Sequence, residues 1–289
     1  MLLRDRLRAR LAEMGDAPDH QRLVADVLGI RNAPPELARR LVAQALVVEA
    51  REDEWRRIGD RLCEAAPDAP GVYVLRDEHG QAIYVGKAVK LRRRLRAHFA
   101  RRRWVALKAA MARVVDAEWQ IVGSELEALV REAALIHELQ PIVNVQTGPP
   151  ALETREIPRA LVRDVIVIVP SVEEDAVELV AARADGALMM QRTSRSGADL
   201  TVPTTRLMRF FQSPLRRSLR HGNRGEFPVD VAPIVFSWLA GRGADATRLD
   251  PHDSPTRRHL AVRLAALVGD EQLFVERVDQ RRSWFHSRE

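Results

Sequence analysis

The sequence is poor in the features of secreted, membrane and cysteine-based proteins. Cys63 is the single cysteine among 289 residues, so the chain has neither an internal disulfide nor a cysteine-based zinc site. No uninterrupted apolar run approaches the roughly 20 residues that a membrane span needs, and the amino terminus lacks the apolar stretch of a secretory signal. These absences favour a cytoplasmic protein without a membrane partner, and we expect Cys63 to be a buried structural thiol.

Several catalytic signatures are also missing. The chain contains no glycine-rich Walker loop, no dinucleotide-binding fingerprint and no His-Glu-x-x-His element. His252 and His259 are isolated in the sequence, so we expect them on the surface and not at a metal ion. A function must therefore come from other residues.

One long stretch lacks negative charge. Residues 80–115 contain no Asp or Glu, but eleven of them are basic: Lys87, Lys90, Arg92, Arg93, Arg94, Arg96, Arg101, Arg102, Arg103, Lys108 and Arg113. A solvated helix face is the alternative, but such a face usually mixes both signs because like charges four residues apart repel. We therefore expect a nucleic acid as the neutralising partner, in agreement with the net charge of +6. The predicted DNA contacts are Lys87, Lys90, Arg92, Arg93, Arg96, Arg101, Arg102 and Arg103.

The chain has only two tyrosines, Tyr73 and Tyr84, and they lie close to this basic stretch. Each belongs to a short apolar run, and the two runs flank residues 77–80, which predicts a β-hairpin with a four-residue loop. If Arg76 pairs with Gln81, Tyr73 lies directly opposite Tyr84, with Cβ atoms about 5 Å apart. Two phenols on one face of a sheet beside many cations indicate a site for phosphate chemistry.

Two helices are predicted after the hairpin. The first covers residues 88–103, and Arg94 borders its apolar stripe, so we expect this arginine to be held in place. The second covers residues 125–139, after a strand at 118–122, and Ser124 opens it with a capping box. Glu132 lies on the apolar flank of the second helix, where a carboxylate is costly unless it is paired or binds a metal. A salt bridge to a neighbouring arginine and a metal site are the two alternatives.

Residues 1–62 predict a helical domain. Their apolar pattern predicts helices over residues 2–14, 20–28 and 36–46, followed by short strands over residues 47–50 and 55–58. These elements would make a winged helix, with Arg39, Arg40 and Gln44 available on the third helix. A plain helical extension is the alternative.

Residues 149–289 predict a mixed α/β region of unassigned role. We expect a linker at 148–150, a strand at 165–169, a hairpin at 176–192 and helices at 202–211, 231–239 and 255–268. A helix over residues 172–183 is the alternative to the hairpin. Residues 213–228 form a basic connector, for which a solvated loop is favoured over phosphate contacts.

The central residues recur in the order of a known family. Gly71-Val72-Tyr73, Tyr84-Val85-Gly86-Lys87, Arg94, residues 124–132 and residues 140–144 strongly resemble the GIY-YIG nuclease superfamily. Val replaces Ile in both tripeptides. The resemblance covers roughly residues 67–146 and is closest to the amino-terminal nuclease domain of the excinuclease subunit UvrC and its homologue Cho. It implies an α+β fold in which residues 63–148 form a small antiparallel sheet flanked by helices.

The resemblance also implies a site, made of Tyr73, Tyr84, Lys87, Arg94, Glu132 and Asn144. Glu132 would hold one Mg²⁺ (or Mn²⁺), and either tyrosine would activate the attacking water. Lys87 would lower the pKa of a phenol, and Arg94 would stabilise charge on the phosphate. Asn144, expected in an extended segment after Pro141, would orient a phosphate or the site.

The implied function is a divalent-metal-dependent DNA endonuclease that makes a single-strand incision in nucleotide excision repair. DNA and DNA-repair proteins are the expected partners, and the nucleoid in the cytoplasm is the expected location. Residues 149–289 show no second Asp/Glu-rich catalytic site, which argues for one incision. A restriction or homing endonuclease and an inactive DNA-binding protein on the same fold are the alternatives.

Overall fold

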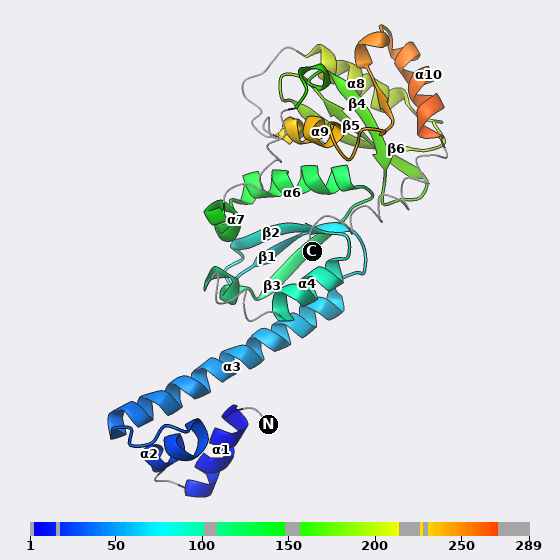
Figure 1. The fold of residues 1–289 in the computed structure, drawn as a ribbon. Helices are drawn as coiled ribbons and strands as arrows, with labels where there is room; N and C mark the ends of the chain where they lie inside the picture. The colour runs from blue at the N-terminus through cyan, green and yellow to red at the C-terminus, as the bar shows by residue number, and fades with distance from the viewer. Residues whose placement is uncertain are drawn as a thin grey trace. The chain divides into compact units, whose positions relative to one another are not determined.

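The computed structural model describes residues 3–15, 18–100, 109–147, 157–213, 226–227 and 231–270. The chain divides into two compact units, Met1–Ala65 with Arg96–Arg102 and Ala66–Leu95 with Arg103–Glu289, whose elements are drawn in Figure 1. None of the described helices is both long and apolar enough to cross a membrane. The predicted linker at 148–150, nearly all of the predicted basic connector, and Arg101, Arg102 and Arg103 lie outside the described residues.

The first unit is helical. Its elements are α1 (Leu3–Met14), α2 (His20–Leu23), the π-helical turn η1 (Val24–Leu28) and α3 (Pro35–Ala65). Asp19 caps α2 by accepting hydrogen bonds from the Gln21 and Arg22 N–H groups. The helices meet through a small apolar core that contains Leu7, Leu23, Val24, Ala38 and Val42.

The winged-helix prediction is wrong, because the strands expected at 47–50 and 55–58 belong to α3, a single helix of 31 residues. No Gly or Pro interrupts residues 36–58, and Ala, Arg and Glu favour a helix there. Later in α3, Trp55 packs on Phe99 with ring centroids 4.5 Å apart, and its indole N–H donates to the Phe99 carbonyl at 3.3 Å. The predicted boundary between residues 62 and 63 falls inside α3, where Cys63 is buried as expected.

The second unit begins with a three-stranded antiparallel sheet. Its strands β1 (Gly71–Arg76), β2 (Ala82–Ala88) and β3 (Asp116–Ile121) lie in the order β2-β1-β3. The helical elements that accompany it are α4 (Leu91–Ala100), η2 (Ala109–Arg113), α6 (Glu125–Leu139) and α7 (Ile142–Thr147). This confirms the small antiparallel sheet flanked by helices.

Helix α6 has the bounds that the sequence predicts. The Ser124 hydroxyl accepts a hydrogen bond from the Glu127 N–H at 3.1 Å, which confirms half of the capping box. The Glu127 carboxylate reaches back to the N–H of Gly123 at 2.9 Å and not to that of Ser124. One face of α6 packs on the sheet, in cores that include Val72 and Val74 of β1.

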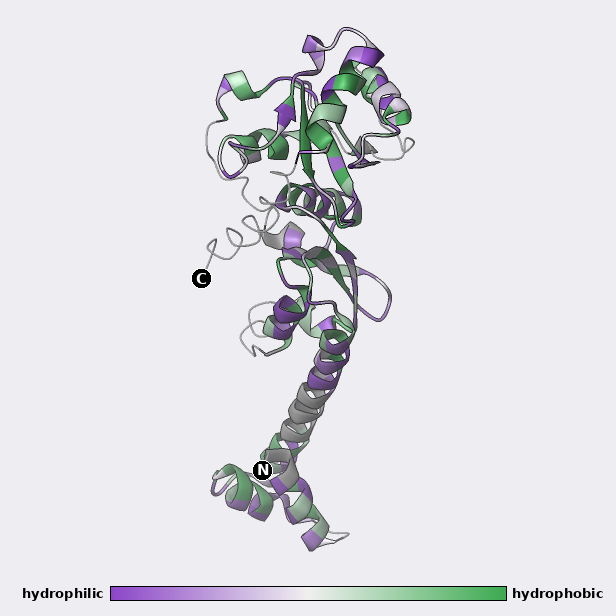
Figure 2. Cartoon of the chain, turned by 90° about the vertical axis from the view of Figure 1, so that its right-hand side faces the viewer, coloured by the Kyte–Doolittle hydropathy of each residue, from purple (hydrophilic) through white to green (hydrophobic). Residues whose placement is uncertain are grey.

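A five-stranded antiparallel sheet follows, with the order β7-β6-β5-β4-β8. Its strands are β4 (Val165–Pro170), β5 (Ala176–Ala182), β6 (Leu188–Ser194), β7 (Glu226–Phe227) and β8 (Arg248–Leu249). The pairing of β5 with β6 confirms the predicted hairpin, and the alternative helix at 172–183 is not formed. Every residue of β4 and β5 is buried, in accordance with the apolar colouring of these strands in Figure 2.

Both faces of this sheet are covered by helices. Helices α8 (Thr201–Gln212) and α10 (Arg257–Val268) pack on the face of Ile166 and Ile168. Helix α9 (Ala232–Leu239) packs on the other face, and α6 adds Leu126 and Val130 to the same core. Helix α6 is therefore shared between the two sheets.

Candidate active site

The two tyrosines lie on one face of the hairpin, but in a different register from the prediction. Tyr73 is opposite Gly86, and Tyr84 is opposite Leu75. The predicted register is wrong for two reasons. Asp77, not Arg76, pairs with Gln81, and the pairing shifts between Leu75 and Arg76 at a β-bulge. The tyrosines are consequently diagonal neighbours, with ring centroids 5.9 Å apart.

Gly86 makes room for both phenols. A Cβ atom at this position would lie 2.7 Å from the Tyr73 hydroxyl and 2.7 Å from Cε1 of Tyr84. Tyr73 is fully buried, whereas Tyr84 is partly exposed. Any side chain at residue 86 would therefore displace the two tyrosine rings, so the motif requires glycine at this position for steric reasons.

Arg94 reaches the same face from α4. Its Nε donates a hydrogen bond to the Tyr73 hydroxyl at 3.4 Å, while Leu91 and Leu95 are buried as predicted. Burial raises the pKa of Tyr73 well above its usual value, the neighbouring Tyr84 raises it further, and Arg94 opposes both. The cation that opposes this rise is Arg94, and Lys87, which the sequence suggested for lowering the pKa of a phenol, bonds to Glu132.

Glu132 and Lys87 meet at the outer edge of β2. Glu132 is 9% exposed, and its two oxygens accept hydrogen bonds from the Lys87 N–H and the Lys87 ammonium, each at 3.0 Å. The carboxylate is therefore paired, with a lysine in place of the arginine that the sequence suggested. Its charge also raises the pKa of Tyr73.

Asn144 lies on the same edge, in α7. The prediction of an extended segment is wrong: β-branched residues favour a strand there, but Val143 is fully buried in helix α7. The Asn144 side chain accepts from the Val85 N–H at 2.8 Å and donates to the Val85 carbonyl at 3.0 Å. It thereby satisfies backbone groups of an edge strand that another strand would otherwise pair.

The residues present fit a single divalent cation. Among the residues that the structure describes, no group of three or more His, Cys, Asp or Glu side chains could hold a metal ion. Mg²⁺ is commonly bound by one or two carboxylates, with water and substrate phosphate completing its shell. Glu132, nearly buried and beside the tyrosines, offers such a carboxylate.

The predicted DNA contacts differ in their surroundings. Lys90 forms an exposed ion pair with Asp68 at 3.4 Å, and Arg92 donates to the Ala66 carbonyl at 2.8 Å. Arg93 and Arg96 are exposed on α4.

His252 and His259, which were not expected to bind DNA or a metal ion, are exposed as predicted.

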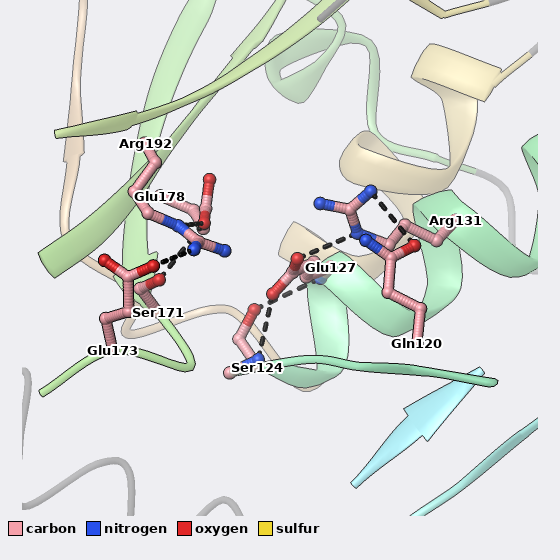
Figure 3. A network of polar contacts seen from close by, with 9 residues as sticks. Gln120, Ser124, Glu127, Arg131, Ser171, Glu173, Glu178 and Arg192 are labelled. Atoms are coloured by element: carbon pink, nitrogen blue, oxygen red, sulfur yellow. Dashed lines mark hydrogen bonds and ion pairs between the residues drawn. The ribbon is translucent and has the colours of Figure 1, made fainter.

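A second polar cluster lies where α6 begins (Figure 3). The buried carboxylate of Glu127 accepts from Arg131 Nε at 2.8 Å, and that of Glu178 on β5 accepts from Arg192 Nε at 2.6 Å. Burial raises the pKa of Glu178, Arg192 opposes this, and the nearby charge of Glu127 raises it further. Glu127 and Arg131 are four residues apart on one helix, but the sequence has no signal that Glu178 and Arg192 lie near them or that Glu125 bonds to Trp238, because these residues are far apart in the chain.

Residues 69–145 match the family model described as the UvrC-like GIY-YIG domain. Curated relatives named UvrABC system protein C align with the same part of the chain. The relative from Desulforudis audaxviator is 44% identical over 79 residues, which are 27% of this chain and 13% of that protein. The relative from Paenarthrobacter aurescens is 48% identical over 81 residues, which are 27% of this chain and 12% of that protein.

A solved structure is also similar. The GIY-YIG amino-terminal endonuclease domain of UvrC from Thermotoga maritima, bound to magnesium as its catalytic divalent cation, is 31% identical and covers 30% of this chain and 94% of that one, with a TM-score of 0.27. The chain spans only about an eighth of the length of the two curated relatives. Residues 69–145 of this chain are therefore a GIY-YIG domain of the UvrC endonuclease type.

Proposed function

We propose that the protein is a divalent-metal-dependent DNA endonuclease that hydrolyses one phosphodiester bond of a DNA strand in excision repair. The observation that carries the proposal is the meeting of Tyr73, Arg94 and Glu132 in one domain of the UvrC type, with Arg94 bonded to Tyr73 and Glu132 acting on its pKa. The sequence relatives belong to a system named UvrABC, so partner proteins of that system and chromosomal DNA are the proposed partners.

Glu132, Arg94 and Lys87 would have different roles in the reaction. Glu132 would hold the metal ion, with Mg²⁺ proposed and Mn²⁺ as a substitute; when bound, such an ion supplies Lewis-acid stabilisation of phosphate charge. Arg94 would donate to the phosphate oxygens in the transition state, where preorganised donors contribute most. Lys87 would orient Glu132, and Asn144 would fix the edge of β2, the strand that carries Lys87.

Tyr84 is the better candidate for activating water. Tyr73 is fully buried, and its raised pKa keeps the phenol protonated. Tyr84 is partly exposed, so a water molecule can reach it. In this arrangement Tyr73 serves by holding Arg94 through its hydroxyl.

A cleavage panel tests the function. The whole chain is incubated with intact duplex, lesion-bearing, bubble, flap and single-stranded DNA, each with Mg²⁺, with Mn²⁺ and with chelator. Nicking of lesion-bearing or branched DNA that the chelator abolishes supports the proposal. A defined pattern on intact duplex would indicate a restriction or homing nuclease, and salt-sensitive binding without cleavage in either metal would indicate an inactive DNA-binding protein.

A further inference from the structure

Helices α8 and α10, which cover one face of the five-stranded sheet (Figure 1), contain basic residues and no Asp or Glu. Their basic residues are Arg206 and Arg209 on α8, and Arg257, Arg258, His259 and Arg263 on α10. Both helices lie outside the residues that match the nuclease family. The proposed chemistry uses no residue of either helix, so this concentration of cations needs another explanation.

Helix α8 ends at the end of the sheet where β4 begins. The Arg183 guanidinium, just after β5, donates hydrogen bonds to the carbonyls of Phe210 and Ser213 at 3.0 and 2.8 Å. The last residue of β5 pairs with the first residue of β4. The second half of α8, which carries Arg206 and Arg209, therefore lies toward this end of the sheet.

Helix α10 begins at the same end. His252, in the turn before α10, has its Nε2 atom 3.0 Å from Oδ2 of Asp164, which directly precedes β4. The other end of α10 lies near the start of α8: a Cβ atom at Gly197, between β6 and α8, would lie 3.5 Å from Ala265 and 3.7 Å from Val268. The two helices therefore run in opposite directions, so the arginines that begin α10 and those near the end of α8 share one end of the sheet.

Four of these arginines are available to a ligand. Within the described ranges, they are exposed and their side chains have no hydrogen-bond or ion-pair partner: Arg206, Arg209, Arg257 and Arg258. Four acidic residues around the same end each have a basic partner already: Asp164 with His252, Asp185 with Arg183, Asp250 with Arg163 and Asp253 with Arg263. The four exposed arginines are thus not neutralised by these carboxylates.

Helix stability does not account for the arginines of α10. Cations are unfavourable in the first turn of a helix, because the positive end of the helix dipole lies there. Helix α10 nevertheless begins with Arg257 and Arg258 and has no acidic residue in that turn. The opposite end of the sheet carries exposed acidic residues instead, namely Glu173, Glu174, Asp175 and Asp199. A solvated face that mixes both signs would not separate charge in this way.

We infer that Arg206, Arg209, Arg257 and Arg258 form a second DNA-binding surface, the α8–α10 basic end, which holds the phosphate backbone outside the GIY-YIG domain. The guanidinium group binds phosphate oxygens with two parallel hydrogen bonds, and phosphate contacts position a protein on DNA without reading its sequence. The choice of DNA as the anion rests on the proposed function, but the binding itself needs neither metal nor cleavage.

Salt-dependent DNA binding tests the inference. The whole chain is titrated into a labelled DNA duplex in chelator at several salt concentrations, and fluorescence anisotropy gives the association constant. Each phosphate contact contributes about 0.9 to the slope of log K against log salt concentration, so replacing the four arginines by Ala should lower the slope by up to about 3.6. Binding at low salt should weaken at least about 10-fold. Replacement by Lys, which keeps the charge, should retain most of the slope.

A matched control removes the same charge elsewhere. It replaces four other exposed arginines by Ala: Arg6, Arg8, Arg31 and Arg248. The control should lose much less of the slope than the variant of the α8–α10 basic end. Thermal unfolding checks that both variants are folded. In a nicking assay, the variant of the basic end should need a higher DNA concentration than the parent for half-maximal rate.

The outcomes separate this inference from the proposed function. An unchanged slope in the folded variant of the basic end would overturn the inference, and so would an equal loss in the control, because the effect would then come from net charge alone. Sedimentation with phosphatidylglycerol vesicles gives a further check. If the four arginines are needed for vesicle binding and not for duplex binding, the surface meets a membrane and the inference is wrong. A parent that binds DNA but never nicks it defeats the proposed function, while the salt slopes still decide the inference.

Discussion

Glu132 accepts hydrogen bonds from both the backbone N–H and the ammonium of Lys87, each at 3.0 Å. A single residue of the edge strand β2 therefore orients both oxygens of the carboxylate proposed to hold the metal. The ammonium also stands where it competes with a divalent cation for one of those oxygens. Lys87 should have opposite effects on cation binding and on cleavage.

Lys87→Met should separate these effects. Removal of the competing ammonium should strengthen Mn²⁺ binding in the absence of DNA, since two like charges near one carboxylate repel. The nicking rate should nevertheless fall about 10- to 100-fold, because Glu132 loses the side chain that orients it. Mn²⁺ titration by calorimetry and nicking assays on the same preparation measure the two effects. Weaker Mn²⁺ binding together with a normal nicking rate would contradict this role.

Gly86→Ala should damage the site by sterics alone. The added methyl would lie 2.7 Å from the Tyr73 hydroxyl, and overpacking of this kind typically costs about 1–3 kcal/mol. Chemical denaturation should show this loss of stability, and nicking should fall with it. Gly269→Ala is the matched control, because its nearest neighbour lies 3.8 Å from the added Cβ. Equal stability of the two variants would refute the steric account.

Asn144→Ala should loosen the outer edge of β2. It leaves the Val85 N–H and carbonyl without the bonds at 2.8 and 3.0 Å, and an unsatisfied buried group costs about 1–3 kcal/mol. Hydrogen exchange of the Val85 amide should accelerate well before global unfolding. Gln140→Ala, at an exposed amide just after α6, should leave that exchange rate unchanged. Protection of Val85 in both variants would show that Asn144 does not secure the edge.

Alkaline titration should distinguish the tyrosines, because the chain has only two. In Tyr84→Phe the remaining Tyr73 should ionise well above its usual value of 10.0, since burial is the largest cause of its raised pKa. Arg94→Ala in that background should raise the pKa further, because a nearby cation favours the phenolate. Absorbance near 295 nm follows both. Ionisation of Tyr73 below 10.0 would contradict the burial argument and reopen the choice of base.

The sequence was sufficient to predict that Tyr73, Arg94 and Glu132 belong to one domain, and insufficient for the geometry in which they meet. Tyr73, Arg94 and Glu132 could be identified because they occur in motifs, and α6 because Ser124 marks its start. The predicted hairpin register is wrong because the pairing shifts at a β-bulge between Leu75 and Arg76. The strands expected after residue 46 are not formed, because no Gly or Pro interrupts α3 over residues 36–58. The segment around Asn144 is helical although its β-branched residues favour a strand, and Val143 is fully buried there. The contact of Trp238 with Glu125 spans 113 residues and has no local signal.

The role of Glu132 is tested most directly by comparing Glu132→Gln with the parent and with Glu138→Gln, an exposed carboxylate on the same helix. Nicking of lesion-bearing or bubble DNA is measured in Mg²⁺, with folding checked by thermal unfolding. We expect Glu132→Gln to lose cleavage by at least about 100-fold, the scale of removing one preorganised group at a reacting centre, while it still binds DNA and Glu138→Gln cuts like the parent. A folded Glu132→Gln protein that nicks DNA at the parent rate would show that Glu132 does not hold the catalytic metal ion.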